Sequence, residues 1–205
     1  MTSPQPNPFP GGDAIDILLD IDGVIYPFPE LFTPYLAERL DRDLELDTTN
    51  WEFYEHWGLD YDDFVAHLAD GVRDQRLWWT GDLYPDVVAS FHRLHDDGHR
   101  IHLVTARDVV GAEAGMSATQ HWLALHDLEV ESLSLAQDKP TVLASLGLDP
   151  AGCLAVDDGA HHIAAWEQAG VYGVVLDRWG TYRGQHRCVN DLTGFTAHLE
   201  LLLAG

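Results

Sequence analysis

Basic residues are scarce in this sequence. Among its 205 residues, 11 are lysine or arginine and 34 are aspartate or glutamate, so the formal net charge is −23 at pH 7. So acidic a surface repels the phosphate backbone of nucleic acids and anionic lipid headgroups. The chain also lacks a stripe of lysine and arginine that would hold a nucleic-acid end. We therefore expect no duplex nucleic acid and no membrane among its partners.

Cysteine and long apolar runs are equally rare. Cys153 and Cys188 are too few for a disulfide scaffold, and Cys153 stands in a short apolar run where a buried free thiol is expected. No apolar run approaches the roughly 20 residues that cross a bilayer. Residues 1–12 contain four prolines but neither the basic cluster nor the apolar stretch of a signal peptide, so we expect a flexible tail and a cytoplasmic location.

Short apolar runs do recur, and they alternate with helical patterns. We expect strands over residues 14–19, 101–104, 130–135, 153–156 and 171–176. We expect helices over residues 85–97, 113–126, 140–146, 160–169 and 192–203. Strands that alternate with helices predict an α/β protein with a Rossmann-like parallel sheet, covered by helices on both faces.

The segment from residue 26 to 82 departs from this alternation. It is rich in aromatic residues and carries helical patterns, whereas a structureless loop of that length is improbable inside a compact domain. We therefore expect a small helical cap at residues 26–82, inserted after the first strand. The core domain would then comprise residues 13–25 and 83–205.

Polar side chains follow several of the expected strands. Asp20 and Asp22 come after the first strand, Thr105 after the second, and the pair Asp157 and Asp158 after the fourth. Ligands of open parallel sheets bind at the carboxyl ends of the strands, so these residues are expected to converge on one crevice. Each signal alone is weak, because turns, cation loops and helix caps use the same residue types. Together, and in this order, they predict a site for phosphate and a divalent cation.

The two acids of the first loop suit phosphoryl transfer. A carboxylate can attack phosphorus and form an aspartyl-phosphate, and a neighbouring carboxylic acid can protonate the leaving oxygen and later activate water. We assign Asp20 as the nucleophile and Asp22 as the general acid and base, with Gly23 permitting a tight bend. An EF-hand calcium loop is excluded, because Val24 and Ile25 occupy positions that need a ligand and a glycine.

Charge balance requires cations at this site. Four ionised aspartates and a phosphate monoester of about −2 would repel one another. Mg²⁺ suits oxygen ligands and phosphate, and its expected ligands are Asp20, Asp157 and the carbonyl of Asp22, with Asp158 acting through water or by orienting a ligand. The phosphate is expected to bind the Thr105 hydroxyl, the Ala106 amide, and the side chains of Arg107 and Lys139, the only lysine in the chain.

These residues resemble the four motifs of the haloacid dehalogenase-like phosphohydrolases. The matching segments are Asp20-Ile-Asp22-Gly-Val, Thr105-Ala-Arg107, Asp138-Lys139-Pro and Asp157-Asp158, and the resemblance extends over about residues 14–190. It implies a Rossmann-like core, an aspartyl-phosphate mechanism and Mg²⁺ as cofactor. The insertion at residues 26–82 resembles the helical cap that these enzymes place between their first two motifs.

Within this superfamily the chain is most similar to the 5′(3′)-deoxyribonucleotidase branch. Phe28 follows the nucleophile loop as an aromatic residue does there, and segments 51–58 and 77–85 resemble that branch's aromatic cap segment and its return to the core. Asp86 replaces the usual glycine, and Arg107 departs from some members. The resemblance implies nucleobase contacts from the cap, for which the candidates are Phe28, Trp51, Trp57, Trp78 and Trp79. Alternatively, some of these rings form the cap's own small core.

The sequence thus predicts a Mg²⁺-dependent phosphatase for small phosphate monoesters, with nucleoside or deoxynucleoside 5′-monophosphates as expected substrates. One alternative is a phosphatase of the same mechanism for a sugar phosphate or another metabolite. Another is a non-catalytic module that binds a nucleotide, which the complete set of acids and Lys139 disfavours, because binding alone needs no nucleophile. A homodimer formed through an exposed cap edge is compatible with the sequence.

Overall fold

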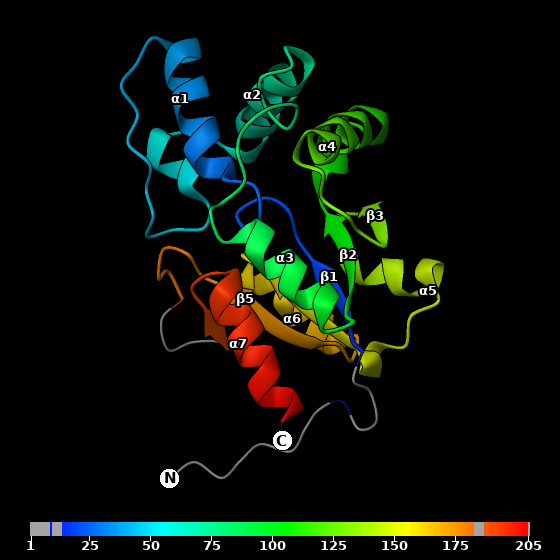
Figure 1. Cartoon of the computed structure of the whole chain (residues 1–205). Helices are drawn as coiled ribbons and strands as arrows, with labels where there is room; N and C mark the ends of the chain where they lie inside the picture. The colour runs from blue at the N-terminus through cyan, green and yellow to red at the C-terminus, as the bar shows by residue number, and fades with distance from the viewer. Residues whose placement is uncertain (1–8, 10–13, 183–186, 205) are drawn as a thin grey trace.

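The computed structural model describes residue 9, residues 14–182 and residues 187–204. Most of the tail predicted for residues 1–12 therefore lies outside the described residues. Phe9 is the exception, because it is buried and its ring centroid lies 5.8 Å from that of Tyr172. Figure 1 shows a sheet flanked by helices, with a group of further helices beyond one end of the strands.

A parallel sheet forms the centre of the described chain, in the strand order β3-β2-β1-β4-β5-β6. The strands are β1 Asp16–Leu19, β2 Arg100–Thr105, β3 Ser132–Leu135, β4 Cys153–Asp157, β5 Tyr172–Leu176 and β6 Cys188–Val189. The inner strands are almost continuous apolar runs, because helices cover both of their faces. The predicted α/β fold with a Rossmann-like parallel sheet is confirmed.

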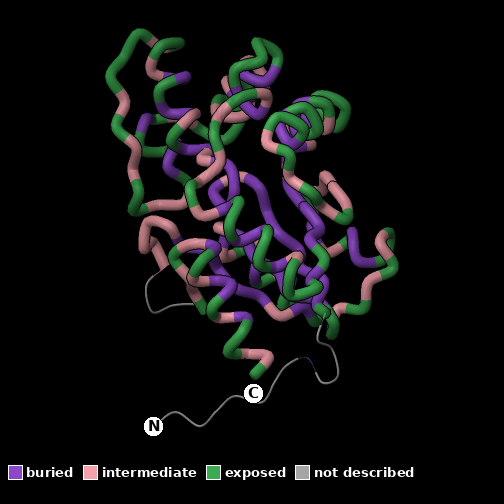
Figure 2. Tube along the Cα trace, viewed as in Figure 1, coloured by how far each residue is buried: buried purple, intermediate pink, exposed green. Residues whose placement is uncertain are grey.

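Two apolar layers cover the sheet. Successive residues of a strand point to opposite faces, so Ile17 and Leu19 belong to one cluster of buried side chains and Leu18 to the other. The first cluster includes residues of α3 Val87–Asp96, α4 Ala112–His126 and α7 Leu192–Leu203. The second includes residues of α5 Val142–Leu146 and α6 Ala160–Gln168. The inner strands β1, β2, β4 and β5 are buried along most of their length, whereas the edge strands β3 and β6 are partly exposed and the helices expose their outer faces (Figure 2). Within the described residues, no helix has the length and apolar character needed to cross a membrane.

Several elements differ from the sequence-based expectation, and β1 and β3 each begin two residues later than expected. Strand β6 is not predicted, because two residues carry no periodic signal. The helix expected from residue 85 begins at Val87, since Pro85 stands in a turn. The helix expected over residues 140–146 is divided into a short 3₁₀ turn, η3 Lys139–Thr141, followed by α5.

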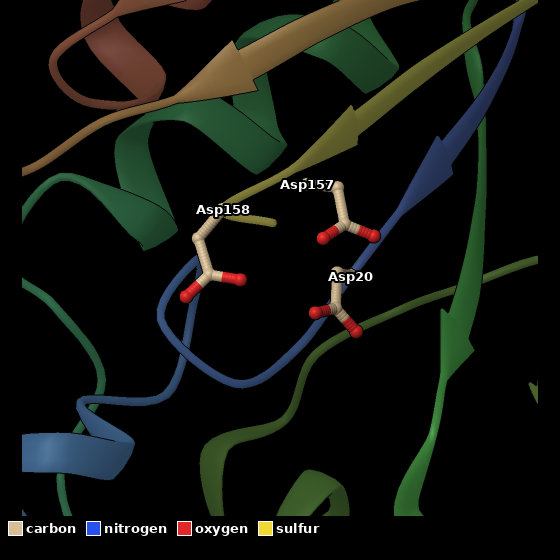
Figure 3. A group of neighbouring side chains, drawn as sticks. All are labelled: Asp20, Asp157 and Asp158. Atoms are coloured by element: carbon tan, nitrogen blue, oxygen red, sulfur yellow. The ribbon is translucent and has the colours of Figure 1, made fainter. Parts of the chain in front are cut away.

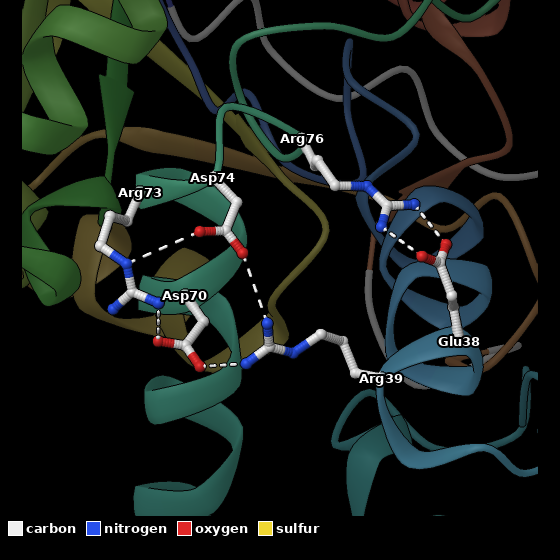
Figure 4. Close-up of polar contacts among 6 residues, drawn as sticks. All are labelled: Glu38, Arg39, Asp70, Arg73, Asp74 and Arg76. Carbon is white, nitrogen blue, oxygen red and sulfur yellow. Dashed lines mark hydrogen bonds and ion pairs between the residues drawn. The ribbon is translucent and has the colours of Figure 1, made fainter.

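Helices α1 Phe28–Leu40, η1 Phe53–Trp57 and α2 Tyr61–Arg73 stand beyond the carboxyl ends of the strands (Figure 1). Ion pairs join α1 to α2 and the turn after it, with Arg39 contacting Asp70 and Asp74, and Glu38 contacting Arg76 (Figure 4). Exposed pairs of this kind contribute little individually. The cohesion of this helical insertion therefore comes mainly from its packed aromatic rings, which include Phe32, Phe53, Trp57 and Phe64.

Candidate active site

The predicted polar residues meet at the carboxyl ends of the strands. Asp20 directly follows β1, Thr105 ends β2 and Asp157 ends β4. Lys139 begins the turn η3 after β3. Because β1 lies between β2 and β4 in a parallel register, these strand ends are neighbours. All four side chains are buried.

Three carboxylates form an acidic cluster at these strand ends. Ligand oxygens of Asp20, Asp157 and Asp158 lie within 4.8 Å of one another (Figure 3). Gly23 packs directly against the cluster, since its φ is +76° and a Cβ there would lie 2.0 Å from Asp158 Oδ2. Asp20 Oδ1 is buried and accepts no well-aligned hydrogen bond, and the ammonium of Lys139 lies 2.9 Å from it. Three carboxylates this close together supply only oxygen ligands. The donor set therefore fits a hard divalent cation such as Mg²⁺.

Lys139 supplies a positive charge within this cluster. Its Nζ lies 2.6 Å from Asp157 Oδ2 and 2.9 Å from Asp20 Oδ1, the second contact being an ion pair without the alignment of a hydrogen bond. Burial opposes the charged ammonium, but the carboxylates of Asp157 and Asp20 outweigh burial and raise the pKa of Lys139. Lys139 is therefore cationic at neutral pH and contacts two acids at once.

Two acids of the cluster, Asp20 and Asp158, resist ionisation. Burial raises the pKa of Asp20, and the opposing charge of Lys139 does not reverse this effect. Burial, together with the charges of Asp157 and Asp20, raises the pKa of Asp158 well above its ordinary value. A divalent cation held by the three acids would stabilise their ionised forms.

Metal binding is expected to stabilise the protein more as the pH rises. Acids whose folded-state pKa is raised contribute stability below their unfolded pKa, and this contribution is lost as the pH rises through the folded pKa. A cation requires the ionised ligands, so its binding offsets this loss. We expect the increase in Tm on replacing chelator with Mg²⁺ to grow between about pH 5 and about pH 8.

The Tm with Mg²⁺ is compared with the Tm in chelator at the same pH, which cancels the titration of histidines elsewhere. An increment that stays constant or falls with pH would contradict the cluster as a cation site, and Asp158→Asn should flatten the pH dependence.

Asp22 contacts Arg107 instead of the acidic cluster. Arg107 Nε and Nη2 donate to the two carboxylate oxygens of Asp22 at 2.9 and 2.8 Å. The sequence predicts Arg107 as a phosphate ligand, but the structure buries its guanidinium completely and places it outside the cavity lining. The reason is the carboxylate of Asp22, which lines the cavity and occupies the guanidinium. The expectation that the Asp22 carbonyl binds the metal stays a prediction.

A cavity of about 740 Å³ is lined by most of the predicted residues. The sheet side contributes Asp20, Asp22, Thr105, Ala106, Lys139 and Asp158 to its lining. Of the five aromatic candidates in the insertion, Phe28, Trp51 and Trp78 line the cavity. A phosphate at the strand ends would therefore leave the rest of its molecule against aromatic rings.

Trp57 and Trp79 do not line this cavity. Trp57 packs its ring on Phe32 inside the insertion and donates its indole N–H to the carbonyl of Glu45 at 2.7 Å. The ring of Trp79 lies 5.3 Å from that of His121. Trp57 therefore belongs to the aromatic core of the insertion, which is the alternative to nucleobase contact.

Several residues of the cavity lining are not predicted from the sequence. The residues that follow β5, Trp179 and Tyr182, could have been found by the same strand-end rule that identified Asp20 and Thr105. His161 and His162, in the first turn of α6, also line the cavity. Burial and the charge of Lys139 lower the pKa of His162 to about 3, so this ring is neutral. Glu52, Phe53 and Tyr54 lie in the segment 51–58 that the resemblance singles out. No sequence signal separates the remaining lining residues from ordinary core or loop positions, among them Asn50, Tyr61, Phe64 and Gln137.

This architecture is the α/β fold of the haloacid dehalogenase-like hydrolases. A haloacid dehalogenase-like hydrolase from Streptococcus pneumoniae superposes with a TM-score of 0.64 at 12% identity, over 91% of this chain and 99% of that one. A HAD-superfamily hydrolase of subfamily IA from Geobacter sulfurreducens gives 0.61 at 17% identity, over 92% and 98%. A protein from Thermotoga maritima, provisionally described as a β-phosphoglucomutase, gives 0.61 at 13% identity, over 91% and 99%. No protein-family model matches the sequence, and no curated protein matches it significantly. Identities this low show the shared fold alone.

Proposed function

We propose that this protein is a Mg²⁺-dependent phosphatase that hydrolyses small phosphate monoesters through an aspartyl-phosphate. The proposal rests on one group of side chains at the strand ends. Buried Lys139 contacts Asp20 and Asp157, and Asp20, Asp22 and Thr105 line the adjoining cavity. The fold shared with haloacid dehalogenase-like hydrolases supports the same reaction class.

The residues have distinct roles in the proposed reaction. A carboxylate oxygen of Asp20 attacks phosphorus while the bond to the leaving oxygen breaks, and Asp22 gives that oxygen a proton. Asp22 then takes a proton from water, which attacks the phosphorus of the aspartyl-phosphate and releases inorganic phosphate and free Asp20. Thr105, Ala106 and Lys139 bind the phosphate oxygens. Mg²⁺ bound by the acidic cluster would neutralise the negative charge that gathers there.

We further propose nucleoside or deoxynucleoside 5′-monophosphates as the substrates. The support is the aromatic lining of the cavity, because a flat base can stack on such rings at about 1–3 kcal/mol per contact. Phe28, Trp51 and Trp78 are the proposed stacking residues. A sugar phosphate is the second candidate, favoured by the fold shared with the Thermotoga protein described as a β-phosphoglucomutase.

Phosphate release from a panel of monoesters tests both the phosphatase activity and the preference for nucleotides. With Mg²⁺ present, we expect turnover of nucleoside 5′-monophosphates with a higher kcat/KM than that of glucose 1-phosphate or glycerol phosphate. Trp51→Ala should lower kcat/KM for nucleotides more than for glycerol phosphate, which has no ring to stack. Equal rates on all esters would contradict the nucleotide as the preferred substrate but would still support phosphatase activity. Nucleotide binding without phosphate release from any ester would indicate a non-catalytic binding module instead.

A further inference from the structure

Arg107 is a buried cation that the proposed reaction does not use directly. Its side chain is 0% exposed, whereas the side chain of its partner Asp22 is 23% exposed and lines the cavity. A charge in such a place requires close partners, because burial without them costs several kcal/mol. The geometry of those partners shows what the guanidinium does.

A hydroxyl group and three aromatic rings surround the guanidinium of Arg107. Nη1 donates to Thr119 Oγ1 at 3.1 Å, and Thr119 in turn donates to the carbonyl of Gly115. The rings of Tyr26, Trp78 and Trp122 surround the guanidinium carbon at 4.9, 4.9 and 5.6 Å. These rings come from the two connections to the helical insertion and from α4, so the arginine has a single orientation.

Asp22 takes its orientation from this arginine. Two parallel N–H groups bind one carboxylate oxygen each, which sets the plane of the carboxylate as well as its position. Each oxygen retains a second lone pair, and the side chain still borders the cavity. A lysine at this position would provide charge without the planar fork.

We propose that Arg107 is a positioning residue, which holds the Asp22 carboxylate in the orientation needed to transfer a proton to the leaving oxygen. This inference rests on the proposed phosphatase reaction. It predicts that loss of Arg107 impairs the step that needs the proton, while the attack of Asp20 on phosphorus is retained.

Two substrates separate proton transfer to the leaving oxygen from the other requirements of the first step. p-Nitrophenolate leaves without a proton, whereas the benzyl alkoxide of benzyl phosphate needs one, and both esters carry a single aromatic ring. General acid catalysis contributes about 10²–10⁴-fold. We expect Arg107→Met and Arg107→Lys to lower the single-turnover rate of benzyl alcohol release by about 10²-fold, with a much smaller loss in the rate of p-nitrophenolate release. Leaving-group release is measured because it precedes the hydrolysis of the aspartyl-phosphate, in which Asp22 serves both esters equally. Asp22→Asn should show the same selective loss, and Asp22→Asn combined with Arg107→Met should be no worse than Asp22→Asn alone.

Two further variants keep the test decisive. Thr119→Val removes one partner of Arg107 without changing any charge, and should produce a smaller loss with the same preference for p-nitrophenyl phosphate. Arg178 is the matched control, because it is a largely covered arginine, with 13% of its side chain exposed, that donates twice to one carboxylate, that of Asp86. Arg178→Met should affect both esters equally.

The outcomes distinguish the two proposals. Equal losses on both esters in the folded Arg107 and Thr119 variants would overturn the positioning role and leave the phosphatase intact. Full retention of activity by Arg107→Lys would also overturn it, because charge alone would then suffice. A wild-type protein that releases phosphate from neither ester and from none of the panel of monoesters would contradict the proposed function, and the role of Arg107 with it.

Discussion

Asp20→Asn should abolish phosphate release, lowering kcat by at least about 10⁴-fold, because an amide cannot form the covalent intermediate. The variant should remain folded, since Lys139 keeps its contact with Asp157 at 2.6 Å and a buried acid with a raised pKa is removed. Phosphate release with Mg²⁺ measures the loss. In parallel, wild-type enzyme quenched during turnover should carry phosphate that hydroxylamine removes, as expected of an acyl phosphate.

Asp16→Asn is the matched control on the same strand. Asp16 lies at the opposite end of β1 and pairs with Arg100 and His102, away from the cavity lining. We expect this variant to lose stability and to keep its kcat. If Asp20→Asn turned over at the wild-type rate, or if Asp16→Asn lost activity to the same extent while folded, Asp20 would not be the nucleophile.

Lys139→Met should produce the largest loss of stability among single substitutions at the site. Removing one partner of a buried ion pair typically costs about 3–5 kcal/mol, because the remaining charge is buried without compensation. Here two carboxylates, Asp20 and Asp157, lose the same cation. Urea unfolding at neutral pH without metal gives the free energy of unfolding. The deficit should shrink at mildly acidic pH, where the acids can bind protons, and on addition of Mg²⁺.

An exposed ion pair provides the contrast for this measurement. Arg39 in α1 contacts Asp70 with 36% of its side chain exposed (Figure 4). Arg39→Met should change the free energy of unfolding by less than about 1 kcal/mol, because water screens the pair. If Lys139→Met were no more destabilising than Arg39→Met, the buried cluster would contribute nothing to folding.

Much of the site was predictable because it depends on topology. A polar residue just past an apolar strand is placed by the parallel sheet itself, and this rule alone brought together Asp20, Thr105 and Asp157. Lys139 was identified because it is the only lysine and precedes a helix. These inferences hold without knowledge of any side-chain conformation.

The direction of a long side chain was not predictable in this way. Arg107 follows Thr105 by two residues, so the phosphate seemed its natural partner. The structure gives it Asp22 and three aromatic rings, two of them from the first and last parts of the insertion. The same limit applied to the tryptophans, because Trp51 and Trp57 lie six residues apart yet only Trp51 lines the cavity.

By itself, the sequence determined the parallel α/β sheet and the set of acids, hydroxyl and ammonium at its strand ends, because apolar periodicity and strand ends are local features of the chain. Only the tertiary structure decided which acids Lys139 contacts, which acid Arg107 contacts, and which aromatic rings border the cavity. Those partners come from segments far apart in the chain, and burial selects among them by packing and charge neutralisation once the segments have folded together.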